Sequence, residues 1–394
     1  KILGENVNLE AKENVINKDA LILGKDKVSI KTKKFENKNT LSNEIELKDG
    51  YENVSWRADI DKINNSRQYY MLKYDIDYER DLRTDSKTRK TKIAAVNKSL
   101  VSGNSVSINA ENVNLSDEKN TGISLKGKNI QVTSKNFNIN GQNIEANNIN
   151  ITTDKANLSN AGIYSDKVNI KAKDMSILSK KETEILFDRG KESMQKENIL
   201  GSIIQSNKDI NLSVDNLKLK GSIIQSKDGK VHLKGNDFNL EAENISKTYN
   251  ANYDIPETFR KIKNHEKLEQ AVGSFVSGKD IKIEYKKTNT KGSGLLANNI
   301  NINANKVNIN TANIKHELDR RIGVDNGILG VNYNKIKKQE NMSIGSIILS
   351  KGDVSTKVDQ EFNLIGSKIK GKKINIEGTS INISGKTDTT TTDT

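Results

Sequence analysis

The sequence predicts an all-β protein, folded as a three-sided parallel β-helix whose coils each hold three short strands in about 19 to 21 residues. Two patterns carry this prediction. Short apolar pairs recur at regular intervals along the chain, and we call this pattern of intervals the beat. Gly-Lys pairs precede the strand at one fixed place in the pattern. A third observation is negative, because apolar residues do not recur every three to four positions as a solenoid of α-helices requires.

The beat is clearest between residues 130 and 175, where the first apolar residues of successive pairs lie 7, 7 and 5 residues apart, a repeat of 19. These residues are Ile130, Phe137, Ile144, Ile149, Ala156, Ile163, Val168 and Met175. The same beat appears at Phe362, Ile369, Ile374 and Ile381, and steps of 7 appear at Ile300, Val307 and Ile314. Each pair predicts a short strand with two inward side chains.

Glycine and asparagine supply the turns between these strands. Gly-Lys stands before a strand at Gly24, Gly127, Gly278 and Gly371. Glycine adopts the positive φ of a tight corner, and stacked asparagine amides bond to neighbouring coils. The phrase GSIIQS occurs at residues 201–206 and again at 221–226. We expect it to mark a coil boundary, so that its second copy belongs to the next coil.

Four segments interrupt the beat. We expect a single β-helix segment over residues 1–385, with excursions at about 43–98, 178–200, 245–276 and 312–345, and a low-complexity linker or end segment at 386–394. After each excursion the repeat resumes with a similar short sequence. Gly201, Gly273 and Gly345, which lie in three of these sequences, are equally spaced along the chain. This spacing indicates a super-repeat of a couple of coils followed by an excursion.

Two excursions predict secondary structure of their own. Alternating apolar residues at 54–60 and 70–78 predict a β-hairpin in the first. In the third, residues 254–257 predict a capped helix start around Pro256, with Phe259, Ile262, Leu268 and Val272 along roughly one side. The expected fold therefore includes an extrahelical β-hairpin and short helical excursions.

The composition limits the class of protein. Of 394 residues, 33% are hydrophobic, none is cysteine, and the net charge is +13. The lack of cysteine excludes disulfides and thiolate metal sites.

Lysine is evenly mixed with acids and does not interleave with aromatic residues, so we expect no nucleic-acid partner. The residues given include no apolar run of about 18, so we expect neither a signal peptide nor a membrane-spanning helix among them. We expect a piece of a longer protein, continued by neighbouring coils of the same chain.

The sequence does not favour catalysis. Enzymatic β-helices need clustered carboxylates or an acidic metal pocket, whereas acids and lysines alternate here, and Asp209 and Asp228 follow lysine in turns. The three histidines, His232, His265 and His316, share no metal-ligand spacing. We therefore expect no enzyme activity, no metal and no cofactor.

The aromatic hairpin of the first excursion is the candidate binding site. Trp56, Tyr70, Tyr74 and Tyr78 could stack on sugar rings or dock a protein partner. Tyr69 lies on the opposite face and cannot share one pocket with them. The alternative is that one face of the hairpin packs on the β-helix while the other is solvated.

Two stretches match a known repeat in which GS-x-[IV]-x-[SA] precedes a Gly-rich turn and a short strand. They are GSIIQSKDGKVHLKGNDFNLEAEN at residues 221–244 and GSIILSKGDV at 345–354. Residues 323–346 are similar to the non-helical insert that accompanies this repeat. On these motifs the chain, from about Val96 onward, resembles the filamentous haemagglutinin family of two-partner-secretion exoproteins.

The resemblance implies a right-handed β-helix, export through an outer-membrane partner pore, and a location outside the cell or on the bacterial surface. It also implies adhesion to a host-cell or bacterial receptor or glycan. The alternative within the family is the stalk of a contact-dependent growth inhibition toxin carrier. The alternative outside it is a glycan-degrading β-helix enzyme. Within residues 1–394 we recognise neither the family's N-terminal secretion domain nor its terminal toxin, which is where the sequence departs from the family pattern.

Overall fold

The computed structural model describes residues 1–39, 41–47, 91–96, 99–117, 122–188, 190–255, 260–325 and 331–393. Over these residues the protein is all-β and contains no helix. It divides into a larger unit, Lys1–Asn39 with Lys98–Thr394, and a smaller unit, Thr40–Asn97. Each unit is described by itself.

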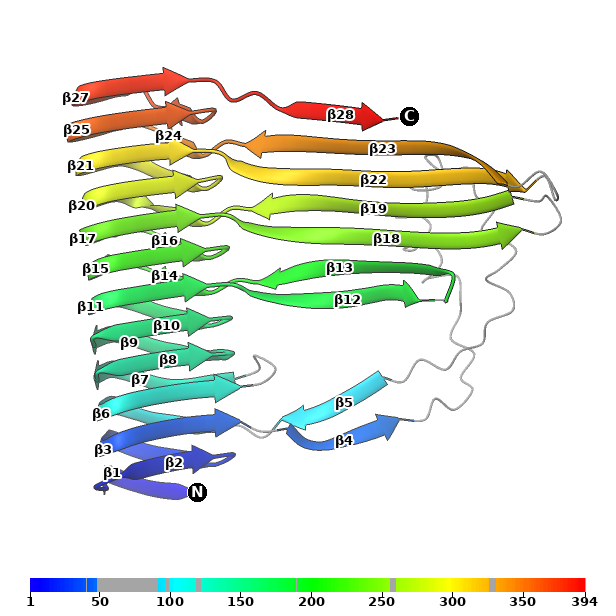
Figure 1. The fold of residues 1–394 in the computed structure, drawn as a ribbon. Coiled ribbons are helices and arrows are strands. Elements are labelled where there is room, and N and C mark those ends of the chain that lie inside the picture. The colour runs from blue at the N-terminus through cyan, green and yellow to red at the C-terminus, as the bar shows by residue number, and fades with distance from the viewer. Residues whose placement is uncertain are drawn as a thin grey trace. The chain divides into compact units, whose positions relative to one another are not determined.

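The larger unit contains a column of parallel strands, each hydrogen-bonded to the strand one coil earlier and one coil later (Figure 1). We use coil for the stretch of chain between a residue and the residue paired with it. The column strands are β1 (Ile2–Glu10), β2 (Asn14–Lys18), β3 (Leu21–Asn39), β6 (Leu100–Asp117), β7 (Gly122–Thr133), β8 (Asn136–Asn140), β9 (Gln142–Thr152), β10 (Lys155–Ser159), β11 (Gly162–Leu178), β14 (Ile203–Ser206), β15 (Ile210–Lys220), β16 (Ile223–Ser226), β17 (Lys230–Glu241), β20 (Phe275–Lys291), β21 (Gly294–Asn310), β24 (Ile347–Ser350), β25 (Asp353–Ile365), β26 (Lys368–Lys370) and β27 (Lys373–Ser384).

The pairing register confirms the repeat read from the sequence. Ile130 pairs with Ile149 and Ile149 with Val168, so both steps have the predicted offset. The two copies of GSIIQS also pair, Ile203 with Ile223 through Ser206 with Ser226. The second copy is therefore the next coil, as predicted. Because inward positions pair with inward positions from one coil to the next, apolar side chains stack on apolar side chains.

Stacked apolar side chains fill the interior of the column. One such ladder, in pairing order, is Val113, Phe137, Ala156, Met175, Leu217, Phe238, Thr288, Val307, Phe362 and Ile381. Phe137, Phe238 and Phe362 are fully buried. Full burial of such a side chain stabilises the fold by roughly 1.5–3 kcal/mol. The thin core is thus continuous along the stacked coils.

The same corner of successive coils is closed in one of two ways. Residues with positive φ close it tightly in six coils of the described chain: Asp19, Asn160, Gly141, Gly221, Gly292 and Gly366. The backbone N–H of each donates to a carbonyl at or next to the end of a strand one coil later, for example Gly366 N to Ser384 O at 2.9 Å. At other coils the chain instead leaves the column here as an antiparallel hairpin.

Among the described residues of the larger unit, three hairpins leave the column in this way and lie side by side (Figure 1). They are β12 (Lys180–Asp188) with β13 (Glu192–Leu200), β18 (Glu243–Ile255) with β19 (Arg260–Val272), and β22 (Ala312–Asp325) with β23 (Val331–Ile344). Together with β28 (Thr389–Asp393) they form a seven-stranded antiparallel sheet in the order β12-β13-β18-β19-β22-β23-β28.

The coils and the hairpins share one spacing. Two coils separate each of these hairpins from the next, for example β20 and β21 between β19 and β22. Two coils advance the column by about 10 Å, which is also the width of two hydrogen-bonded strands. Each hairpin therefore leaves the column at the position along its axis where it can pair with the neighbouring hairpin. This requirement explains the equal spacing of Gly201, Gly273 and Gly345.

Two sequence predictions are wrong in the larger unit. The helix predicted from residue 254 is absent, because Ile262 and Leu268 lie on strand β19, where pairing with β18 and β22 overrides the local preference. Ile314 lies on β22 in the hairpin sheet and not in the column. Within the segment that the sequence analysis described as a linker or end, residues 389–393 form β28, whose β-branched threonines pair with β23. Pro256 and Phe259 lie outside the described residues.

The smaller unit contains one antiparallel pair, β4 (Leu41–Leu47) with β5 (Thr91–Val96). Leu41 pairs with Val96, and the register shifts between Ser42 and Glu44. The predicted aromatic hairpin at residues 54–60 and 70–78 lies outside the described residues.

Candidate binding surfaces

The serine that follows glycine in the repeated GS phrase builds the corner at which the hairpins re-enter the column. Ser222 N donates to Ser274 Oγ at 3.1 Å, and Ser274 N donates to Ser293 Oγ at the same distance. Ser293 N in turn donates to Ser346 Oγ at 3.3 Å. These buried hydroxyls satisfy backbone N–H groups that would otherwise lose a partner at the corner. The GS phrase is therefore explained by structure and need not mark a ligand site.

The glycine of the phrase is required by close approach between coils. A Cβ on Gly201 would lie 2.8 Å from the carbonyl oxygen of Gly221, and a Cβ on Gly345 would lie 2.3 Å from that of Gly366. Any larger residue would force adjacent coils apart at the point where a hairpin returns.

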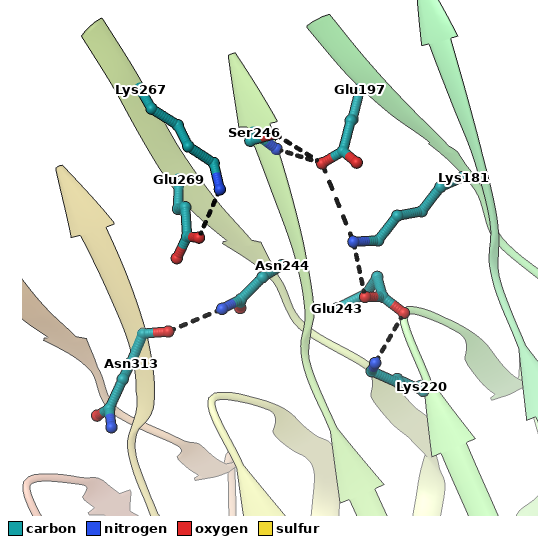
Figure 2. A network of polar contacts seen from close by, with 9 residues as sticks. All are labelled: Lys181, Glu197, Lys220, Glu243, Asn244, Ser246, Lys267, Glu269 and Asn313. Carbon is teal, nitrogen blue, oxygen red and sulfur yellow. Dashed lines mark hydrogen bonds and ion pairs between the residues drawn. The ribbon is translucent and has the colours of Figure 1, made fainter. Parts of the chain in front are cut away.

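Polar contacts join the bases of neighbouring hairpins, as Figure 2 shows. The carboxylate of Glu243 on β18 pairs with Lys181 on β12 at 3.2 Å and with Lys220 on column strand β15 at 3.1 Å. Glu197 on β13 accepts hydrogen bonds from the backbone N and the Oγ of Ser246 on β18, at 2.7 and 3.0 Å. The first and second hairpins are thus fixed to each other and to the column.

The second and third hairpins are joined at their bases in the same way. The side-chain amide of Asn244 on β18 donates to the backbone carbonyl of Asn313 on β22 at 2.8 Å (Figure 2). The carboxylate of Glu269 on β19 accepts from the backbone N of Lys315 at 3.1 Å and pairs with Lys267 at 3.6 Å.

Farther from the column, two buried or half-buried polar clusters cross the hairpin boundaries. The two carboxylate oxygens of Glu192, a residue only 5% exposed, accept hydrogen bonds from the hydroxyls of Tyr249 and Tyr253, each at 2.6 Å. His316 on β22 bonds through Nδ1 to Glu340 on β23 at 2.7 Å and through Nε2 to Glu266 on β19 at 3.0 Å. The sequence analysis missed both clusters, because only the cross-strand register brings these residues together.

The outer edge of the sheet at β12 exposes two apolar side chains. Ile185 is 68% exposed and Leu186 is 44% exposed. The register with β13 shifts between Ile185 and Phe187. Such a bulge bends an edge strand and disrupts further pairing, which is a common protection against strand addition. We therefore do not assign this edge as a docking site.

A shallow depression of about 360 Å³ lies on the column beside Tyr164. Lys126, Glu145, Tyr164 and Gln205 stand at the same position in four successive coils and line it. The Tyr164 ring lies over Gly162, where a Cβ would come within 2.4 Å of ring atom Cε2. Glycine at this position lets the ring rest on the backbone.

Polar side chains at the neighbouring turn form the other wall of the depression. Asp166 accepts hydrogen bonds from the amides of Asn147 at 3.1 Å and Asn207 at 2.7 Å. Lys126 and Glu145 form an ion pair of 3.2 Å. Partial burial, and after it the charge of Glu145, raises the pKa of the Tyr164 phenol above its ordinary value. The hydroxyl therefore keeps its proton at neutral pH.

The predicted binding residues Trp56, Tyr70, Tyr74 and Tyr78 lie outside the described residues, and so does Tyr69. In the described part of the chain no three His, Asp or Glu side chains converge as metal ligands. His316 illustrates why, since its two carboxylate partners bind opposite sides of the ring. His232 is half-exposed on β17 and contacts Glu284. His265 lies on strand β19, not on the predicted helix, and contacts Asn250.

Comparisons of the chain with protein-family models, with characterised proteins and with solved structures gave no match. The described part of the chain also contains no apolar helix of membrane-spanning length. The resemblance to filamentous haemagglutinins therefore rests on the sequence motifs alone.

Proposed function

We propose that this chain is a segment of a secreted, cell-surface adhesin of the haemagglutinin type, which acts as a structural and binding rod without catalysis. The observation that carries the proposal is the shared spacing of coils and hairpins in the larger unit. A column that spaces hairpins so that they pair into one sheet suits a protein that presents a broad surface at a distance. Export through an outer-membrane partner pore belongs to the same proposal.

We further infer that the column is a right-handed parallel β-helix. Parallel strands joined by a crossover connection are right-handed in nearly all proteins, because a right-twisted strand favours that return. The in-register stacking of apolar and asparagine side chains supports a helix of coils. Asn239, Asn289, Asn308 and Asn363, for example, are linked by amide hydrogen bonds of 2.7–2.9 Å.

A second candidate function is a stalk that carries a contact-dependent inhibition toxin. The continuous column favours this candidate as well, because stacked coils hold one end of a chain far from the other. A stalk would bind neither host cells nor bacteria through this segment, and that difference separates the two functions.

The test is binding of the labelled, purified chain to host cells and to bacteria. Two trimmed variants are measured beside it. In one, residues 246–269 are replaced by a short Gly-Asn turn, which shortens the second hairpin and divides the sheet. In the other, residues 53–81 are replaced in the same way. Circular dichroism verifies that all three proteins keep their β structure.

We expect the intact chain to bind host cells. Loss of binding in one trimmed variant would assign the binding to the segment removed, whereas binding by both variants would leave the column as the binding surface. Binding to neither cell type would contradict the adhesin function and favour the stalk. Release of reducing sugars from cell-surface polysaccharide by the intact chain would contradict the absence of catalysis.

A further inference from the structure

We propose that the depression beside Tyr164 binds neutral hexopyranose units of an oligosaccharide. The inference rests on the proposed function and deepens it, since it names a ligand class and a site for that ligand. The site lies on the column, and none of its lining residues belongs to a strand of the hairpin sheet.

The first argument is the aromatic platform. A pyranose ring has an apolar face of C–H groups, and such a face packs on the face of an aromatic side chain. Tyr164 is half-buried on an outer surface of the column, and its ring is supported from below by the backbone of Gly162. A ring held in this way loses little conformational freedom when a ligand packs against it.

The second argument is the set of polar groups at the rim. Sugar hydroxyls both donate and accept hydrogen bonds, and planar amides and carboxylates match adjacent hydroxyls with two atoms at once. Asn147, Asp166 and Asn207 present two amides and a carboxylate that are already oriented by their mutual hydrogen bonds. Gln205 and the protonated phenol of Tyr164 add a further amide and a hydroxyl donor. A few oriented polar groups beside an apolar surface are typical of small-ligand sites.

The third argument concerns charge. Lys126 and Glu145 neutralise each other across 3.2 Å, and Asp166 is the remaining charged group described at the rim. A sialylated, uronic or sulfated sugar would bring its anion towards the Asp166 carboxylate, which is unfavourable. A neutral sugar avoids that repulsion and can still donate its hydroxyls to the carboxylate.

The fourth argument concerns length. The four residues of the ladder from Lys126 to Gln205 span three inter-strand steps, or about 14 Å along the column. A single monosaccharide would leave most of this surface uncovered. The site therefore fits a short stretch of a longer glycan that runs along the column.

The test uses an array that displays β-linked neutral gluco- and galacto-oligosaccharides beside their sialylated and sulfated counterparts. The labelled intact chain is applied first, and the neutral oligosaccharide that binds best is then titrated against the variants. Tyr164→Ala should weaken binding by about tenfold or more, because it removes the platform. Tyr164→Phe should keep most of the affinity, since it retains the ring.

Gln225→Ala is the matched control. Gln225 occupies the next step of the same ladder but does not line the depression, so its replacement should leave affinity unchanged. Preference of the chain for the acidic glycans, or equal affinity of Tyr164→Ala and the wild type, would overturn the inference. Cell binding without any neutral glycan binding would overturn this inference alone, whereas glycan binding without cell binding would overturn the adhesin function alone.

Discussion

The column and the hairpin sheet belong to one chain and are both made of strands, yet different interactions hold them. The column stacks apolar side chains such as Phe137 and Phe238, which are fully buried. The sheet is joined across its hairpin boundaries by polar contacts, those of Glu192, Glu243 and His316 among them. Burial is non-directional, whereas hydrogen bonds fix partners. The column therefore provides stability, and the sheet depends on specific pairs for its arrangement.

The largest effect should come from emptying the column core. Phe137→Ala removes a fully buried ring between Val113 and Ala156 and should destabilise the protein by about 3–5 kcal/mol. Urea denaturation followed by circular dichroism measures the loss. Ile185→Ala, on the exposed edge of the sheet, is the control and should change stability by less than about 0.5 kcal/mol. Equal effects of the two variants would contradict the division between column and sheet.

A smaller effect should follow when a polar contact of the sheet is broken. Glu192→Gln replaces one of the two oxygens that accept from Tyr249 and Tyr253, so one hydroxyl loses its acceptor at a cost of about 1–3 kcal/mol. Hydrogen exchange should quicken in β13 and β18 while the column amides keep their protection.

Glu182→Gln provides the comparison for this variant, because Glu182 is exposed and pairs only with Lys180 among the described residues. Exchange should be unchanged in that protein. If Glu192→Gln instead quickened exchange throughout the column, the sheet would not be an independent element.

One change should strengthen the column. Thr288 is fully buried in the ladder between Phe238 and Val307. Its hydroxyl forms no hydrogen bond with any described group. Thr288→Val keeps the shape and removes the unsatisfied group, so we expect a gain of about 1 kcal/mol in urea denaturation. Thr379→Val should give no gain, because the Thr379 hydroxyl donates to the carbonyl of Asp359 at 2.7 Å. A loss of stability in Thr288→Val would indicate a bound water inside the coil.

The smallest effect concerns pH and the ion pairs of the sheet. Lys338, and after it His316, lowers the pKa of the Glu340 carboxyl below its ordinary value of 4.5. Because the folded-state pKa is the lower one, this contribution to stability is complete above about pH 4.5 and is lost as the pH falls through the folded-state pKa. The acid-induced fall in the urea midpoint should therefore be shallower in Glu340→Gln than in the wild type. If the urea midpoints of the two proteins fell in parallel as the pH is lowered, the Glu340 carboxyl would have no role in the pH dependence of stability.

The column was predictable from the sequence because its spacing is local. The offset between coils can be read directly from the positions of Ile130, Ile149 and Val168 in the chain, and the pairing confirms it. The hairpin sheet was not predictable in the same way. Leu268 and Ile262 suit one side of a helix as well as a strand, and only the neighbouring hairpins decide between them.

The candidate binding surface on the column was also invisible in the sequence. Tyr164, Asn147 and Asn207 come from three different coils, so their separation along the chain conceals that they lie together. The glycine two residues before it is the one local sign, since it leaves room for the ring. Its meaning becomes clear only when the coils are stacked.

The shared spacing of coils and hairpins also limits how such a chain can evolve. Loss of one coil, such as the stretch of chain from Ile281 to its partner Ile300, would bring the next hairpin one strand too close to its neighbour. Every hydrogen bond between those two hairpins would then be displaced, although the column itself would still stack. Insertions and deletions in this region are therefore tolerated only as whole modules of two coils and a hairpin, like the segment from Gly273 to Gly345. The protein can change its length by duplication in such units, and its sheet widens by two strands each time.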